Sequence, residues 1–267
     1  MKIIEWNDVV QRRVNLSSPS AATIGVFDGL HRGHEALISR VVSKAPEFLP
    51  VAFTFGVNPK KFTKPHRYAG SIFTLQQKIL ALEGAGIEAC VLIDFSSNFS
   101  KLAGSEFVST LVRSFGVRSF VVGSDFKCGH RLSTDAEALK TIAGSLGADA
   151  EIVEPLCFEG EIVSSSRIRS AISDGRMDLA LAMLGRPYTL DLRGVEIGLD
   201  GDDAVVSLRK WGVAEPGHGT YQVTFVFDER RYVGQARYCN NGMLRWPRVQ
   251  DESSKCPDFI AFGQKIA

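Results

Sequence analysis

The chain has 267 residues, of which 45% are hydrophobic and 23% are charged, and its formal net charge at pH 7 is +1. This composition is that of an ordinary globular protein and excludes a disordered or fibrous chain. The near-neutral charge gives no global reason to expect nucleic acid or an anionic membrane surface as a partner, so recognition of anions must come from local clusters. The length predicts one domain of ordinary size and a smaller companion.

The cysteines and the N-terminus bear on the cellular compartment. The five cysteines are widely spaced and include no Cys-x-x-Cys pair, which speaks against a disulfide framework and a zinc ribbon. Charges interrupt the N-terminus too early for the apolar centre of a signal peptide, and no run approaches the ~20 apolar residues that span a bilayer. The sequence therefore predicts a cytoplasmic protein with reduced thiols.

Short apolar runs alternate with longer amphipathic stretches between residue 21 and about residue 184, the pattern of β-α-β units in a parallel sheet covered by helices. Most of the predicted strands are continuous in Val, Ile and Phe, as in strands buried on both faces. These strands are Ala22–Phe27, Pro50–Phe55, Ala89–Ile93, Ser119–Val122 and Ala150–Val153. The predicted helices are Gly33–Ser43, Thr74–Glu83, Ser105–Phe115 and Asp135–Leu146, and the second of them opens on a capping box, Thr74 to Gln77.

Beyond Leu184 the pattern changes to alternating segments divided by Gly, Asp and Pro turns. The clearest of these segments are Ala204–Leu208, Thr220–Phe227 and Tyr232–Ala236. We therefore expect an α/β domain with a parallel sheet over residues 1–184, followed by a small antiparallel barrel or sandwich over residues 185–267.

Two histidines and several glycines follow the first predicted strand. Open α/β sheets bind ligands at the carboxyl ends of their strands. Glycines let backbone N–H groups approach phosphate oxygens, and a helix N-terminus adds a favourable partial charge. His31 and His34, three residues apart, are expected on one side of the first helical turn, where they can donate to a pentacoordinate phosphate or its leaving oxygen. The predicted phosphate site also contains Gly25, Phe27, Asp28, Gly29 and Gly33.

The histidine pair has two other interpretations. A zinc pair needs further ligands, and the neighbourhood offers only Asp28 and Glu35, so we expect no metal site made by the protein alone. The two rings can also simply cap and pack. The strand-glycine-helix context favours the phosphate site over both alternatives.

Three motifs then occur in an order that resembles one known family. Thr23–His34, Val121–Gly129 and Val163–Arg169 are similar to the N-terminal signature, the Gly-x-Asp/Asn-Phe-x-x-Gly loop and the Ile-Ser-Ser-Thr-Arg-Ile-Arg element of the bacterial bifunctional riboflavin kinase/FAD synthetase family, within the HxGH nucleotidyltransferase superfamily. The resemblance implies a Rossmann-like FMN adenylyltransferase that condenses FMN with ATP to give FAD and pyrophosphate, with the help of Mg²⁺.

The third motif fits phosphate binding on its own terms. Hydroxyls and free N–H groups at a helix start bind phosphate, and an arginine one turn further in neutralises its charge. The alternative is that a serine merely caps a helix predicted over Arg167–Ser173. The resemblance makes Ser165 and Ser166 ATP ligands and adds Arg169 to His31 and His34 as a catalytic residue.

The second motif contains Gly123 and Asp125, in a glycine-rich turn after the fourth predicted strand. A carboxylate there can accept a hydrogen bond from a ribose hydroxyl or an adenine amine, or help to bind magnesium through water. The alternative is an ordinary Asx-turn. The resemblance places both residues in the ATP site.

The end of the second predicted strand departs from the family. Where the family shows Thr-Phe-Asp/Glu-Pro-His-Pro, this chain has Gly56, Val57 and Asn58 in place of the acid, the proline and the histidine. Asn58 can still hydrogen-bond a phosphate or ribose, and it is the one residue that we assign to FMN. A basic cluster follows, which either holds the FMN phosphate or is a solvated loop: Lys60, Lys61, Lys64, His66 and Arg67.

The C-terminal part resembles a riboflavin kinase barrel without its chemistry. Gly185–Tyr188 and Pro216–Val223 are similar to landmarks of that barrel, but Ile197–Ala204 stands where the Pro-Thr-Ala-Asn signature is expected, and the chain ends near the place of the catalytic Glu strand. Without a metal-binding hydroxyl and a general base, phosphoryl transfer to riboflavin loses its positioning and its charge stabilisation. We expect a single activity in residues 1–184 and a degenerate kinase-like domain in residues 185–267.

Two alternatives stay open. The acceptor can be another phosphate, such as nicotinamide mononucleotide, phosphopantetheine or a polyol phosphate, because the histidine motif reads only the nucleotide phosphates. Alternatively, the protein is a flavin- or nucleotide-binding regulator that has lost catalysis. The intact histidine pair and third motif argue against the regulator.

Overall fold

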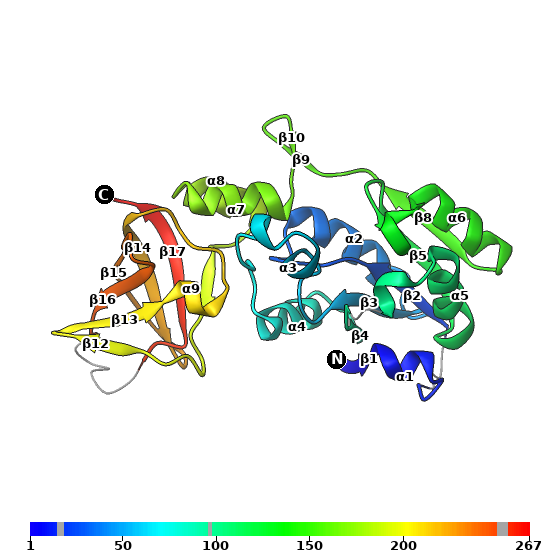
Figure 1. The fold of residues 1–267 in the computed structure, drawn as a ribbon, viewed down its shortest axis with the longest axis horizontal. Helices are drawn as coiled ribbons and strands as arrows, with labels where there is room; N and C mark the ends of the chain where they lie inside the picture. Colours follow the sequence, from blue (N-terminus) through cyan, green and yellow to red (C-terminus); the bar gives the residue numbers. More distant parts are fainter. Residues whose placement is uncertain (15–18, 96–97, 250–255) are drawn as a thin grey trace. The chain divides into compact units, whose positions relative to one another are not determined.

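The computed structural model describes residues 1–14, 19–95, 98–249 and 256–267, which form two compact units (Figure 1). Met1–His66 and Lys78–Ile162 make the first unit, and Arg67–Gln77 and Val163–Ala267 make the second. The second unit therefore begins before the boundary that we predicted between residues 184 and 185, and that functional boundary stays a prediction. No helix in the described part of the chain is long and apolar enough to cross a membrane.

A six-stranded parallel sheet lies at the centre of the first unit as described, in the order β1-β4-β3-β2-β5-β8. Its strands are Lys2–Glu5 (β1), Ser20–Ile24 (β2), Leu49–Phe55 (β3), Ala89–Ile93 (β4), Val117–Gly123 (β5) and Asp149–Val153 (β8). The chain builds outward from β2 to β3 and β4, then returns to the other side of β2 with β5. The strand order thus reverses between β2 and β5, and such points open ligand crevices at the carboxyl ends of the strands.

Helices cover both faces of this sheet (Figure 1). They are Trp6–Val10 (α1), Arg32–Val42 (α2), Lys60–Thr63 (α3), Leu75–Gly84 (α4), Gly104–Ser114 (α5) and Ala136–Ser145 (α6). The helices α1, α5 and α6 share one core with alternate residues of the strands, because successive side chains of a strand point to opposite faces. The helix α2 packs on β2, β3 and β5, and its buried residues lie outside that core.

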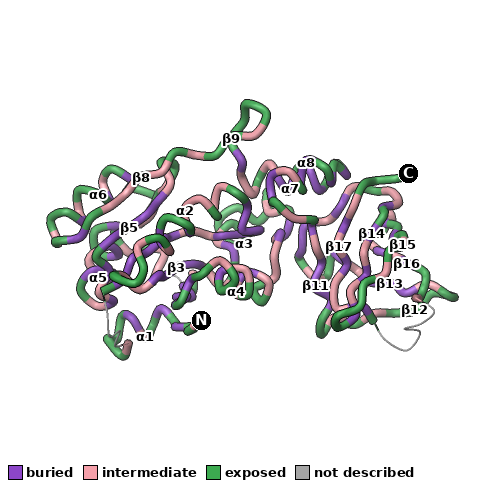
Figure 2. Tube along the Cα trace, turned by 180° about the vertical axis from the view of Figure 1, so that it is seen from behind, coloured by how far each residue is buried: buried purple, intermediate pink, exposed green. Residues whose placement is uncertain are grey.

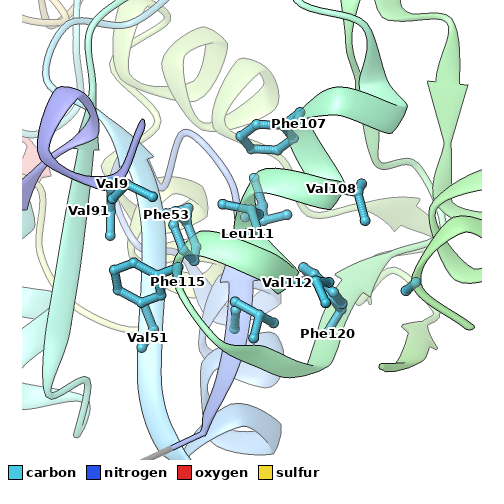
Figure 3. Packing of buried hydrophobic residues seen from close by; sticks show 14 of the residues in the cluster. Val9, Val51, Phe53, Val91, Phe107, Val108, Leu111, Val112, Phe115 and Phe120 are labelled. Atoms are coloured by element: carbon cyan, nitrogen blue, oxygen red, sulfur yellow. The ribbon is translucent and has the colours of Figure 1, made fainter. Parts of the chain in front are cut away.

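The main core is aromatic and β-branched (Figure 3). Phe53 of β3 meets Phe115, the C-cap residue of α5, with ring centroids 5.0 Å apart and planes at 71°. Leu111 and Phe120 pack in the same cluster and are fully buried. Each such side chain stabilises the fold by roughly 1.5–3 kcal/mol relative to exposure, so this core contributes strongly to the stability of the first unit.

The second unit is built on an antiparallel sheet in the order β11-β17-β14-β15-β16-β13-β12. Its strands are Thr189–Asp191 (β11), Gly198–Asp200 (β12), Asp203–Ser207 (β13), Gly219–Phe227 (β14), Arg230–Tyr238 (β15), Met243–Pro247 (β16) and Phe259–Lys265 (β17). Burial alternates along β14, as expected when one face of a sheet covers a core. Ser165–Ser173 (α7), Met177–Leu184 (α8) and Leu208–Trp211 (α9) complete the unit, and Figure 2 shows buried residues gathered on its strands.

The predicted fold class is confirmed: a parallel α/β sheet is followed by an antiparallel, barrel-like one. The five predicted strands of the first domain correspond to β2, β3, β4, β5 and β8, and both hydrogen bonds of the predicted capping box form between Thr74 and Gln77. One strand end was wrong, because β2 ends at Ile24 rather than Phe27. The strand β1 was missed because it has only two apolar residues, Ile3 and Ile4, which lie between the charged Lys2 and Glu5.

Candidate active site

The loop between β2 and α2 is buried and strained. Phe27 and Leu30 have φ angles of +49° and +36°, and Gly29 has a φ of +82°. A left-handed φ at a residue other than glycine costs of order 1 kcal/mol or more, and such residues gather at functional sites. A Cβ on Gly25 would come within 2.9 Å of the Phe27 ring, so only glycine leaves room for this turn. The loop is thus held tightly at the carboxyl edge of the sheet.

The two histidine rings lie face to face at the start of α2. Their centroids are 3.6 Å apart with planes at 17°, and the Phe27 ring packs edge-on against His34 at 5.2 Å. His31 is the N-cap residue, and its Nδ1 accepts a hydrogen bond from the backbone N–H of His34 at 3.3 Å. An accepting Nδ1 leaves the proton of the neutral imidazole on Nε2. The pair can therefore present N–H donors to an anion beside a helix N-terminus.

Capping and phosphate binding are compatible here, since His31 caps the helix with one nitrogen and keeps the other for a ligand. The described residues contain no group of three or more His, Cys, Asp or Glu side chains suited to a metal ion, and the interpretation of the histidine pair stays a prediction.

Gly123 and Asp125 lie at the carboxyl end of β5, directly beside β2 in the sheet. The turn closes through a hydrogen bond from Phe126 N–H to the Gly123 carbonyl at 3.0 Å. A Cβ on Gly123 would come within 2.7 Å of Asp125 Oδ1, so the glycine makes space for that exposed carboxylate. The predicted second motif and the histidine loop therefore share the edge at which the strand order reverses.

Asn58 follows β3 at the same edge but is engaged locally. It is buried, and its Oδ1 accepts a hydrogen bond from the backbone N–H of Lys60 at 3.0 Å, at the start of α3. The basic side chains after it, Lys60, Lys61, Lys64, His66 and Arg67, are all exposed. Their exposure is equally compatible with anion binding and with a solvated loop.

The third motif lies on the second unit. The helix α7 begins at Ser165, two residues earlier than predicted, and Ser164 caps it by accepting a hydrogen bond from Arg167 N–H at 3.2 Å. Arg169 is buried and donates from Nε to the Gly70 carbonyl at 2.9 Å and from Nη1 to the Ser165 carbonyl at 3.0 Å. The capping role thus belongs to Ser164, and Ser165 and Ser166 occupy the first turn of the helix.

One charged residue at the carboxyl edge of the parallel sheet was not predicted from the sequence. Lys78 of α4 is only 5% exposed, and its Nζ donates to the carbonyl of Phe55, the last residue of β3, at 2.8 Å. The sequence did contain a hint that Lys78 is buried. Lys78 precedes Leu82 by four residues and therefore lies on the buried stripe of α4, where an apolar residue is expected.

Comparison with known proteins confirms the family that the three motifs indicated. The profile of the FAD synthetase family matches residues 14–167. The chain is 29% identical over 238 residues to a bifunctional riboflavin kinase/FMN adenylyltransferase of Buchnera aphidicola, covering 85% of this chain and 75% of that protein. It is 31% identical over 223 residues to the protein of the same description from Pseudomonas fluorescens, covering 80% and 71%.

A solved structure resembles the whole chain. The crystal structure of a protein described as a macrolide-efflux protein from Streptococcus pneumoniae has a TM-score of 0.84 with 24% identity, and the match covers 100% of this chain and 91% of that one. At this identity the likeness shows a shared fold, with both sheets included.

Proposed function

Because the chain belongs to the FAD synthetase family, we propose that it transfers the adenylyl group of ATP to the phosphate of FMN, giving FAD and pyrophosphate. The observation that carries the proposal is the stacked His31 and His34 pair at the N-terminus of α2, behind a strained glycine-containing loop. This pair lies inside the matched region and at the reversal point of a parallel sheet, where such folds bind ligands.

The proposed chemistry is an in-line displacement. A phosphate oxygen of FMN attacks the α-phosphorus of ATP, the new P–O bond forms as the bond to the bridging oxygen breaks, and pyrophosphate leaves with that electron pair. His31 and His34 donate N–H groups to the charge that develops on the pentacoordinate phosphorus and its leaving oxygen. No general base is needed, because the attacking phosphate is already ionised, and most of the rate comes from orientation.

The remaining assigned residues bind the nucleotide. The backbone at Gly25, Phe27, Asp28, Gly29 and Gly33 cradles the phosphates next to the positive end of the α2 dipole. Asp125, beside Gly123, accepts from the ribose or adenine. Ser165 and Ser166 bind phosphate oxygens from the first turn of α7, and Arg169 supplies positive charge to the triphosphate from a side chain that two backbone carbonyls orient.

Magnesium fits this arrangement as an ion that arrives with ATP. Mg²⁺ is usually bound by one or two carboxylates together with substrate phosphates and water, and Asp125 offers an exposed carboxylate at the sheet edge. When bound, the ion neutralises the charge of the leaving pyrophosphate.

We further propose that residues 185–267 have no riboflavin kinase activity. In place of the expected signature, Gly198–Asp200 and Asp203–Ser207 form a hairpin around Gly201, which has a φ of +64°. The carboxylates there face arginines: Asp200 pairs with Arg245 at 2.5 Å, and Asp202 lies 3.9 Å from Arg248. These pairs between carboxylates and arginines, in place of the hydroxyl-bearing signature, support the proposal.

Product analysis tests the proposal. The purified protein is incubated with magnesium and ATP together with FMN, riboflavin or nicotinamide mononucleotide in separate reactions. We expect FAD and pyrophosphate in the reaction with FMN and no adenylylated product in the reactions with the other two acceptors. Adenylylation of nicotinamide mononucleotide in preference to FMN would assign another acceptor, and ATP binding without turnover on any acceptor would support the regulator instead.

A further inference from the structure

The loop between α9 and β14, residues 212–218, is joined by a backbone bridge to another part of the second unit. Ser71 and Val213 form an isolated parallel bridge. In this bridge Ser71 N–H donates to the Gly212 carbonyl at 2.9 Å, and Ala214 N–H donates to the Ser71 carbonyl at 2.8 Å. The α9–β14 loop therefore fixes the backbone on either side of Ser71.

Gly70, the residue before this bridge, fits only as glycine. Its φ is +83°, and a Cβ there would overlap the Val213 carbonyl and come within 2.7 Å of the Ala214 backbone nitrogen. Backbone atoms cannot move aside as the end of a flexible side chain can. Any other residue at position 70 would therefore displace its own carbonyl from the place that the bridge gives it.

The Gly70 carbonyl holds the arginine of the third motif. Arg169 donates to it from Nε at 2.9 Å, and from Nη1 to the Ser165 carbonyl at 3.0 Å. A guanidinium carries its donors in a rigid planar fork, so bonds at two of its nitrogens fix its plane. Ser165 belongs to α7 itself, whereas Gly70 ties the side chain to the bridge.

The same loop holds the C-terminal end of α7. Gly217 N–H donates to the Ile172 carbonyl at 2.9 Å. Two buried tyrosines secure the loop in turn: Tyr221 of β14 donates to the Gly217 carbonyl, and Tyr188, just before β11, donates to the Ala214 carbonyl at 2.5 Å. The helix and its arginine are thus both attached to one loop of the antiparallel sheet.

We propose that the antiparallel sheet serves adenylyl transfer as a scaffold: its α9–β14 loop holds α7, and Gly70 is a positioning residue that sets the direction of the Arg169 guanidinium. This inference rests on the proposed function, in which Arg169 binds the triphosphate. It gives the sheet a task that needs no kinase signature.

Thermodynamic linkage allows a test on the wild-type protein. If the bridge supports ATP binding, ATP must stabilise the bridge by the same free energy. Hydrogen exchange with and without magnesium and ATP measures this. We expect ATP to slow exchange in the peptides that contain Ser71 and Ala214 more than in the hairpin of residues 198–207, the control for general stabilisation. Equal slowing in all three would overturn the inference.

Gly70→Ala tests the bridge by substitution, with Gly194→Ala as its matched control. Gly194 also has a left-handed φ, +73°, but a Cβ there would meet nothing within 4 Å. We expect Gly70→Ala to weaken ATP binding about tenfold, as loss of a hydrogen bond to a charged group does, and Gly194→Ala to bind ATP like wild type. Calorimetry gives the affinities, and Tm reports folding. If Gly70→Ala does not fold, the exchange experiment decides.

A double-mutant cycle shows whether Gly70 acts through Arg169. Arg169→Ala alone should weaken ATP binding, and adding Gly70→Ala should weaken it no further, because the side chain that Gly70 positions is already absent. Equal losses from Gly70→Ala with and without Arg169 would mean a merely structural role and overturn the inference. ATP binding at wild-type strength by either single variant would do the same.

The inference and the proposed function fail separately. A wild-type protein that binds ATP but forms no FAD sinks the proposed function, and the cycle is then judged by ATP affinity. A wild type that forms FAD, with additive losses in the cycle, sinks the inference alone.

Discussion

Several side chains of the site carry a structural and a proposed chemical task at once. His31 caps α2 through Nδ1, and its ring stacks on His34. Asn58 closes the start of α3 through Oδ1 at the position assigned to FMN. Substitutions at such residues change stability and activity together, so informative variants must keep one task while they remove the other.

His31→Asn separates the two tasks of that histidine. Asparagine is among the best N-cap residues, so the free energy of unfolding should stay within about 1 kcal/mol of wild type. Asparagine is shorter than histidine, so its amide would not reach the position of the imidazole Nε2–H, and kcat for FAD formation should fall by roughly 10²–10³-fold. Steady-state kinetics and urea unfolding measure both effects, with His130→Asn, at an exposed histidine, as control. Wild-type kcat in His31→Asn would exclude the proposed role.

Neighbouring serines at the start of α7 should give opposite results. Ser164→Ala removes the helix cap and should cost about 1 kcal/mol of stability with little effect on turnover. Ser165→Ala leaves that cap in place, and through its proposed contact with ATP it should raise the KM for ATP. Thermal unfolding and ATP titrations of the two variants check the contrast. The reverse pattern would mean that the ligand is bound by the capping serine.

At the scale of elements, the alternation of side chains along each strand sets two different environments. Phe53 and Val91 face the main core, and Cys90 of β4 faces the opposite side of the sheet, where Lys78 lies. A thiol fully buried in a strand is harder to ionise than one in water. Burial raises the pKa of Cys90 to about 11.

This raised pKa predicts a loss of stability in alkali. The unfolded thiol ionises near pH ~8.5, whereas the folded one keeps its proton until about pH 11. Between these values the unfolded chain binds fewer protons, so the free energy of unfolding falls as pH rises, by at most about 1.4 kcal/mol per pH unit. Denaturant unfolding from pH 8 to 10 should show a flatter profile for Cys90→Ala than for wild type. The exposed Cys157→Ala should keep the wild-type slope.

The two units of the molecule contain different predicted motifs. The first has the parallel sheet with the histidine loop, and the second has the antiparallel sheet together with the third motif on α7. The second unit has an antiparallel, barrel-like sheet, and the residues where the kinase signature was expected form a hairpin. Because a fold can persist without the activity that it usually carries, this arrangement fits the proposed loss of kinase activity.

Riboflavin distinguishes a one-activity enzyme from a bifunctional one. Loss of a positioned general base costs roughly 10²–10⁴-fold, so the proposed loss of kinase activity predicts that FMN formation from riboflavin and ATP is at least about 100-fold slower than FAD formation from FMN. The same protein sample supplied with FMN serves as its own positive control. Comparable rates of the two reactions, followed by chromatography of the flavins, would contradict the loss of kinase activity.

The local sequence pattern was enough to predict much of the fold of this protein. Continuous apolar strands alternating with amphipathic helices determined the parallel sheet, because burial on both faces demands such runs. The glycine and histidine spacing after the first strand predicted a phosphate loop, and that role stays a prediction. The tertiary structure alone decided that β2 stops at Ile24, that Asn58 closes a turn and that Lys78 is buried and donates to the Phe55 carbonyl. These features depend on backbone torsions and on contacts between residues far apart in the sequence. Composition and periodicity do not encode either.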